Sequence, residues 1–156
     1  MKGRIEITHN YFPQMGPELR RAADREAEGT ARSILSHAQI AMSEPKHGRE
    51  YHIYASPGIV TRIKRALTGN RGLGARYVTH IASAPGEAPA VDTGALRASG
   101  YVKPVQPGTW EVGFTGENSE PLEYGTPHIE PRPYLRPAVD AYRERFLAAI
   151  RRLVGQ

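Results

Sequence analysis

The side chains that could do chemistry in this chain of 156 residues are its histidines and carboxylates, because it contains no cysteine. His128 and Glu130 form a His-x-Glu pair on an extended stretch, which places both side chains on one face where a metal ion could use them. His47 and His52 are the other close pair. Neither pair has zinc-site spacing, and the His-x-Glu pattern of zinc deaminases needs two downstream cysteines. The sequence therefore predicts no metal site and no other cofactor.

Other catalytic patterns are incomplete. Glu123 and Glu130 could form a carboxylate pair, but the prolines around them favour a structural role, accepting hydrogen bonds from backbone amides or arginines. The glycines at 69, 72 and 74 lack phosphate-loop spacing. Ser99 lacks the GxSxG context of a serine nucleophile. We therefore expect a protein that is not an enzyme.

The residues from Leu122 to Ala138, LEYGTPHIEPRPYLRPA, are dominated by proline. Four prolines within eleven residues exclude regular helix or central strand over most of this stretch. Residues that precede proline favour extended geometry, so Thr126 to Arg136 should form a stiff strap that leads from a sheet into a final helix. Gly125 should occupy a turn position with positive φ.

Two amphipathic helices should flank the middle of the chain. The first is expected from Pro17 to about Met42, with an alanine-rich apolar stripe and a stop at Pro45. The second is expected from about Pro133 to Val154. Its apolar positions recur every three or four residues, at Leu135, Val139, Tyr142, Phe146, Ile150 and Leu153.

The remaining regular structure should be short strands. Alternation or composition predicts strands over Lys2–Thr8, Arg49–Ala55 and Arg76–Ala82, and a hairpin of Tyr101–Val105 with Trp110–Phe114, whose second strand should turn Trp110, Val112 and Phe114 to the core. Asp92 or Thr93 should cap a short helix that runs through Arg97, with Gly94 making a close backbone contact. The expected fold is α+β, in one domain spanning residues 1–156: a small antiparallel sheet packed by a long N-terminal and a C-terminal helix. Residues 57–75 should form a long projecting loop, or arm.

The net charge of +5 is unevenly distributed. Five basic residues and no acidic residue lie between Tyr51 and Gly86: Arg62, Lys64, Arg65, Arg71 and Arg76. Either this is a solvated basic loop, or it contacts a polyanion such as nucleic acid. No apolar run approaches the roughly 20 residues of a membrane span, and the N-terminus lacks the apolar centre of a signal peptide. We therefore expect a soluble protein made in the cytoplasm.

Two blocks resemble a known family. LEYGT followed by PRPYLRPA is similar to the "EfGT … RPFLRPA" signature of the phage head–tail joining and tail-component family. HIASAPGEAPAVDTGALRAS (His80–Ser99) is similar to the "ASaPGePPavdTGrLr.S" block of the same family. Both blocks occur in the expected order and together cover roughly residues 78 to 140. The motif positions present are Asp92, Thr93, Gly94, Leu96, Glu123, Gly125, Thr126, Arg132, Pro133, Leu135, Arg136 and Pro137.

The resemblance implies a structural virion protein at the head–tail junction, or neck, of a long-tailed phage, with a tail-completion or tail-terminator role. It implies a homo-oligomeric ring, typically sixfold, around the DNA channel, assembled in the host cytoplasm, with head connector or stopper proteins and the tail tube protein as partners. Tyr124 and Tyr134 stand where phenylalanine is commoner in the family, and residues 57–75 have no counterpart in it.

Two contact surfaces are expected. We hypothesise that the strap and the VDTGAL segment form the contact between subunits, through Asp92, Thr93, Leu96, Glu123, Thr126, Arg132, Tyr134 and Arg136. We further hypothesise that the basic residues of the 62–76 region face the DNA channel or an acidic neighbouring ring. The alternative is a nucleic-acid-binding accessory protein that uses this basic region, although no aromatic stacking platform is interleaved with it.

Overall fold

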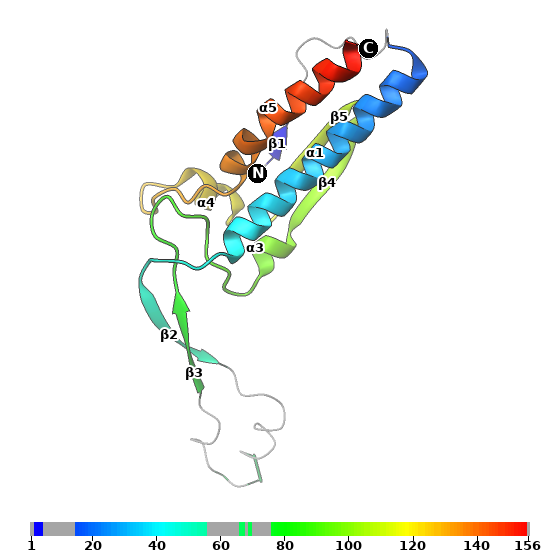
Figure 1. Cartoon of the computed structure of the whole chain (residues 1–156). Helices are drawn as coiled ribbons and strands as arrows, with labels where there is room; N and C mark the ends of the chain where they lie inside the picture. The colour runs from blue at the N-terminus through cyan, green and yellow to red at the C-terminus, as the bar shows by residue number, and fades with distance from the viewer. Residues whose placement is uncertain (1, 5–14, 56–65, 68, 70–75, 156) are drawn as a thin grey trace.

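The computed structural model describes residues 2–4, 15–55, 66–67, 69 and 76–155. Its α+β architecture is the one predicted: helices α1 (Pro17–Ser43) and α5 (Leu135–Val154) lie side by side against antiparallel strands (Figure 1). The strands are β1 (Lys2–Arg4), β2 (Glu50–Ala55), β3 (Arg76–Ile81), β4 (Gly100–Gln106) and β5 (Thr109–Phe114). Two short helices, α3 (Ala95–Ala98) and α4 (Ser119–Tyr124), complete the described elements.

Helix α1 forms because its small and apolar residues recur at helical spacing. Pro17 occupies its first turn, where a missing N–H costs nothing. The buried side chains follow a single stripe that faces α5 and the sheet: Ala23, Ala27, Thr30, Ala31, Ile34, Ala38 and Met42. The predicted range, Pro17 to about Met42, is confirmed to within a residue.

The main sheet has the strand order β1-β5-β4, with both pairs antiparallel. Pro107 and Gly108 form the turn between β4 and β5, and Gly108 has φ +76°. Val112 and Phe114 of β5 are buried against the helices, as predicted. The Asp24 carboxylate on α1 accepts hydrogen bonds from the Gly108 N–H and the Trp110 indole N–H, both at 3.0 Å. These bonds fix the tip of the hairpin to the helix.

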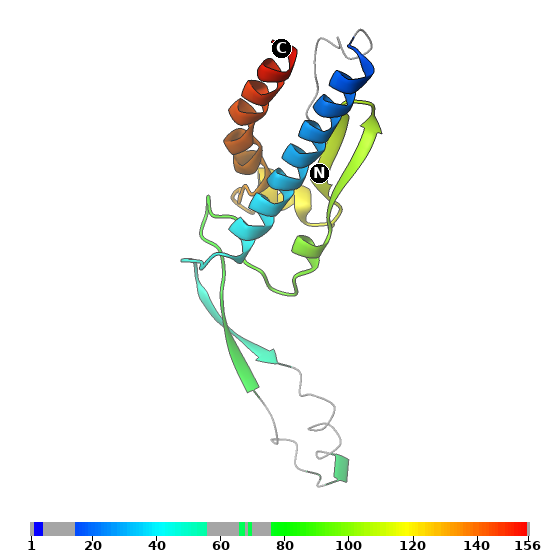
Figure 2. The same ribbon diagram turned by 45° about the vertical axis from the view of Figure 1, so that its right-hand side comes forward.

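Strands β2 and β3 pair only with each other among the described residues, from Glu50↔Ile81 to Ala55↔Arg76. They form a second, two-stranded sheet that projects away from the helices and the main sheet in both views (Figures 1 and 2). The strand predictions for these residues are confirmed. Most of the predicted arm lies outside the described residues, as do the side chains of all five basic residues from Arg62 to Arg76. Residues 5–8 of the predicted first strand lie outside them too.

Two details of the C-terminal third differ from the prediction. The strap does not leave the sheet directly, because the unpredicted helix α4 comes between β5 and the strap. Helix α5 begins at Leu135 rather than at Pro133, because Tyr134 still has non-helical φ and ψ of −135° and −30°. None of the helices in the described part of the chain has the length and apolar character that a membrane crossing requires.

Candidate assembly interface

Glu123 is an N-terminal cap for helix α5 rather than a surface residue. Its side chain is 1% exposed. Oε2 accepts the backbone N–H groups of Tyr134 and Leu135 at 2.8 and 3.0 Å, and Oε1 accepts that of Arg136 at 2.8 Å. A carboxylate suits this place because the first amides of a helix have no partner within the helix and carry partial positive charge. The predicted structural role of Glu123 is confirmed.

Tyr134 anchors the end of the strap in the core. Its side chain is 1% exposed, and its ring meets Phe114 edge-on with centroids 5.1 Å apart. The Tyr134 hydroxyl donates to the Ser119 carbonyl oxygen at 3.1 Å, and burial raises the pKa of this phenol. Neither Glu123 nor Tyr134 can therefore meet a neighbouring subunit in this conformation. Their predicted place in a subunit contact is wrong, because both are needed inside the subunit.

The strap is held by hydrogen bonds to its backbone and by a required glycine. The Thr126 side-chain oxygen accepts the N–H groups of His128 and Ile129, closing a tight turn. The Arg132 N–H donates to the Leu122 carbonyl at 2.7 Å. Gly125 has φ +78°, as predicted, and a Cβ there would lie 2.8 Å from the Ile129 carbonyl oxygen. Glycine is therefore required on both conformational and steric grounds.

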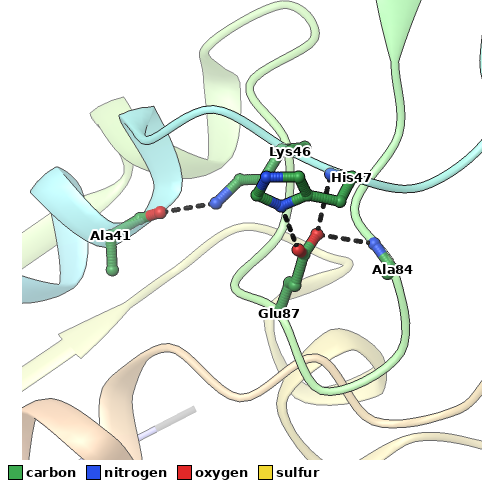
Figure 3. Close-up of polar contacts among 5 residues, drawn as sticks. All are labelled: Ala41, Lys46, His47, Ala84 and Glu87. Carbon is green, nitrogen blue, oxygen red and sulfur yellow. Dashed lines mark hydrogen bonds and ion pairs between the residues drawn. The ribbon is translucent and has the colours of Figure 1, made fainter.

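A second polar network, centred on Glu87, fixes the base of the projecting hairpin (Figure 3). Glu87 Oε2 accepts the backbone N–H groups of Ala84 and His47 at 2.8 and 3.2 Å, while Oε1 lies 2.7 Å from His47 Nδ1. The Ala84 amide, followed by His47, lowers the pKa of Glu87 to about 2. Lys46 Nζ donates to the Ala41 carbonyl in the last turn of α1 at 2.6 Å, as the same close-up shows.

The two motif blocks meet next to this network. The Gly86 N–H, in the first block, donates to the Pro131 carbonyl oxygen in the strap at 3.1 Å. The Gly48 N–H donates to the Ala82 carbonyl at 3.0 Å, and a Cβ on Gly48 would clash with that oxygen. The hairpin base is thus joined to the strap through backbone groups and to the end of α1 through the Lys46 side chain. Both blocks act as scaffold for the hairpin.

The VDTGAL segment carries the other predicted contact residues. Asp92 and Thr93 are exposed, and the Thr93 hydroxyl accepts the Ala95 N–H at 3.3 Å. The N-cap of α3 is Gly94, with no side-chain cap hydrogen bond, so the prediction that Asp92 or Thr93 caps this helix is wrong. Leu96 is half-buried against the core. Gly94 has φ +79°, and a Cβ added there would have no neighbour closer than 4.0 Å. The predicted close contact at Gly94 is therefore wrong, and its backbone conformation is what favours glycine.

Of the strap residues predicted to lie at the subunit contact, Thr126 and Arg136 are exposed and Arg132 is partly exposed. The Arg136 guanidinium lies over the exposed Tyr124 ring, 5.1 Å from its centroid. Arg132 Nε is buried and has no hydrogen-bond partner among the described residues. These residues, with Asp92 and Thr93, remain accessible for the predicted contact.

The residues considered for catalysis serve the backbone or face solvent. The Ser99 hydroxyl donates to the Leu96 carbonyl at 2.7 Å and accepts the Gly116 N–H at 3.1 Å. His128 and Glu130 are exposed, and no cluster of three or more potential metal-ligating side chains occurs within the described ranges. Ser33 and His37 line a hollow of about 460 Å³ on α1 and α5. The Ser33 hydroxyl donates to the Gly29 carbonyl, so this serine, like Ser99, bonds to backbone.

Sequence reasoning missed Glu87. The Pro85-Gly86 pair signals a turn, and Gly86 has φ +81°. The partner of the carboxylate, His47, lies 40 residues away in the chain, so local pattern could not identify it.

Comparisons of the chain with protein-family models, curated proteins and solved structures give no match. The resemblance of the two blocks to the phage family therefore stays a prediction.

Proposed function

We propose that this chain is a structural virion protein of the phage head–tail junction, and that it associates with copies of itself in a ring around the DNA channel. In this role it performs tail completion or termination between the head connector and the tail tube. The chemistry is that of fitting surfaces together rather than converting a substrate.

One observation supports this proposal above others. The carboxylates of Glu87 and Glu123, one in each motif block, serve to hold backbone in place: Glu87 contacts two amides and a histidine, and Glu123 accepts three amides. What the resulting scaffold presents to solvent is a two-stranded sheet that pairs with no other strand in the described part of the chain. Such a hairpin is marginally stable alone in water, so its projection fits a protein that acts by contact with neighbours.

The proposal is tested by imaging the purified chain by negative-stain electron microscopy at low salt. We expect ring-shaped particles with an open centre and a fixed number of subunits. A chain that stays as single 17.2 kDa subunits at every accessible concentration would contradict the proposal.

The alternative, a nucleic-acid-binding accessory protein, is separated by a salt titration of DNA binding. Phosphate contacts release counterions, so such a protein should lose DNA affinity steeply as salt rises. We expect instead that DNA affinity is weak and that the discrete oligomer forms without DNA.

A further inference from the structure

The β2–β3 hairpin lacks a partner strand among the residues that the structure describes. Each of its two strands is an edge strand, because neither pairs with any other strand that the structure describes. Figures 1 and 2 show it pointing away from the helices and from the main sheet. Edge strands and exposed apolar side chains are features that proteins ordinarily cover. Among the described elements, the hairpin is therefore the one that most needs a neighbour.

The two faces of the hairpin differ in chemistry. Side chains alternate between faces along a strand, and Tyr51 is paired with His80, so Tyr51 and Val78 lie on one face. Both side chains are 45% exposed. The Arg49 guanidinium lies 5.3 Å from the centroid of the Tyr51 ring. This face, which we name the Tyr51–Val78 face, also carries the half-buried His80, and it presents two exposed apolar side chains with a cation beside them.

The opposite face contains, by register, Glu50, His52, Tyr54, Tyr77, Thr79 and Ile81. Among its members whose side chains the structure describes, Ile81 is the one large exposed apolar residue, at 44%, and it lies next to the exposed carboxylate of Glu50. An acidic partner surface would therefore be repelled by this face and attracted by the Tyr51–Val78 face. The charge of the surrounding sequence agrees, since there are five basic residues and no acidic one between Tyr51 and Gly86.

A surface of the opposite charge lies around helix α4. From Pro104 to Pro131 the chain has five glutamates and neither lysine nor arginine. Glu111 and Glu123 are buried, which leaves three exposed carboxylates. Two large apolar side chains are exposed beside them, Tyr124 at 53% and Ile129 at 41%. We name this surface the acidic patch; it consists of Glu117, Glu120, Tyr124, Ile129 and Glu130.

The acidic patch is held in shape by its backbone. Glu120 and Tyr124 are four residues apart on α4, so they share one side of the helix. The Thr126↔Ile129 bridge folds the following turn back on itself. The three carboxylates make no ion pair with any residue that the structure describes, whereas the neighbouring cation Arg136 is stacked on Tyr124. The patch thus offers apolar surface together with negative charge that no described cation pairs.

We propose that the Tyr51–Val78 face of one copy docks on the acidic patch of a second copy of this chain. The charges are complementary, and each surface presents two large exposed apolar side chains that the contact would cover. The hairpin and the patch are different surfaces, so each copy gives one and receives one, and the repeated contact can close into a ring. This inference rests on the proposed self-association and identifies the surfaces that carry it.

The test is disulfide trapping, which is clean because the chain has no cysteine of its own. A Val78→Cys copy and a tagged Ile129→Cys copy are mixed and mildly oxidised, and we expect a disulfide-linked dimer containing one of each. Two matched controls should lose this product. Thr79→Cys lies on the opposite face of the same strand, and Val154→Cys is exposed at the end of α5, outside the patch.

Charge reversal then tests the chemistry of the contact. Adding Glu117→Lys and Glu120→Lys to the Ile129→Cys copy should abolish trapping, whereas Asp140→Lys and Glu144→Lys on the exposed side of α5 should leave it unchanged. Far-ultraviolet circular dichroism of each variant shows that the chain remains folded. Trapping that is equal for Val78→Cys and Thr79→Cys, or that survives reversal in the patch, would overturn the proposal.

A mixing experiment tests the directionality of the contact. Copies with Tyr51→Thr and Val78→Thr keep β-forming residues but lose the docking face, and copies with Glu117→Lys and Glu120→Lys lose the patch. Each should be monomeric alone, and a mixture should give dimers and nothing larger, since one intact face meets one intact patch. If rings of the unmodified chain form without any Val78–Ile129 trapping, this inference fails and the proposed function stands. If neither rings nor trapped dimers form, the proposed function fails as well.

Discussion

Replacing Glu123 should destabilise the whole domain, although this residue is a carboxylate on the short helix α4 and not an apolar side chain of the core. The buried carboxylate accepts three backbone N–H groups at the start of α5. Glu123→Ala leaves those donors without a partner at a buried helix end. A buried donor left unpaired costs about 1–3 kcal/mol. The Tyr134 and Leu135 amides would be left unpaired, whereas water can reach the amide of the exposed Arg136, so we expect the free energy of unfolding to fall by about 3–5 kcal/mol.

Glu123→Gln keeps a side chain of the same size in this place but removes its negative charge and changes one of its hydrogen bonds. A glutamine carbonyl oxygen at the Oε2 position keeps the bonds to Tyr134 and Leu135, but its amide group then faces the Arg136 N–H. One bond and the favourable charge at the helix end are lost, so we expect a loss of about 2 kcal/mol.

The assay is urea denaturation followed by circular dichroism at one protein concentration. For a domain of this size about 1 kcal/mol corresponds to roughly 2–4 °C in Tm, so thermal melts of Glu123→Ala should shift by about 10 °C. Glu120→Ala, on the exposed side of the same short helix, is the matched control and should stay within about 0.5 kcal/mol of the unmodified chain. A Glu123→Ala variant as stable as this control would refute the capping role.

Three further outcomes follow from the same structure. The pKa of Glu87 is lowered to about 2 from 4.5, chiefly by the Ala84 N–H and then by His47, so its stabilisation is complete above about pH 4.5 and is lost as the pH falls towards 2. Urea midpoints of Glu87→Gln should therefore fall less over that pH range than those of the unmodified chain; parallel profiles would contradict this. Gly29→Ala, inside α1 with no atom outside the adjacent helix backbone within 4 Å of the new Cβ, should stabilise the protein by about 0.5–1 kcal/mol. Gly125→Ala should instead cost more than about 1 kcal/mol, because it combines φ +78° with a contact of 2.8 Å, and equal melting temperatures for these two variants would exclude the steric explanation.

The helices and the β4–β5 hairpin could be predicted because their signals are local. Apolar spacing in α1 and α5 and the Pro107-Gly108 turn each act within a few residues. Helix α4 was missed because six residues with a proline at their third position give no periodicity, although proline is tolerated in a first helical turn. The half-buried state of Val139 and Tyr142 on α5 could not be predicted either, since it depends on how α1 crosses that helix.

The candidate site was predictable in part. The proline pattern indicated that Glu123 would bond to backbone. The pattern could not indicate that it caps α5, because this requires the chain to fold back and bring residues eleven to thirteen positions later next to Glu123. The same pattern placed Glu123 and Tyr134 at a subunit surface, where the structure buries both. The acidic patch could have been seen in the sequence as a segment without lysine or arginine. Its pairing with the hairpin required the register that separates the Tyr51–Val78 face from the face of Glu50.

The mass of the species that the purified chain forms in solution tests the proposed self-association most directly. Native mass spectrometry or sedimentation velocity at low salt should show one discrete multiple of the 17.2 kDa subunit, with six copies expected from the family resemblance. Charge screening should convert it to subunits as salt rises. A single 17.2 kDa species at all concentrations and salt conditions would contradict the proposed ring.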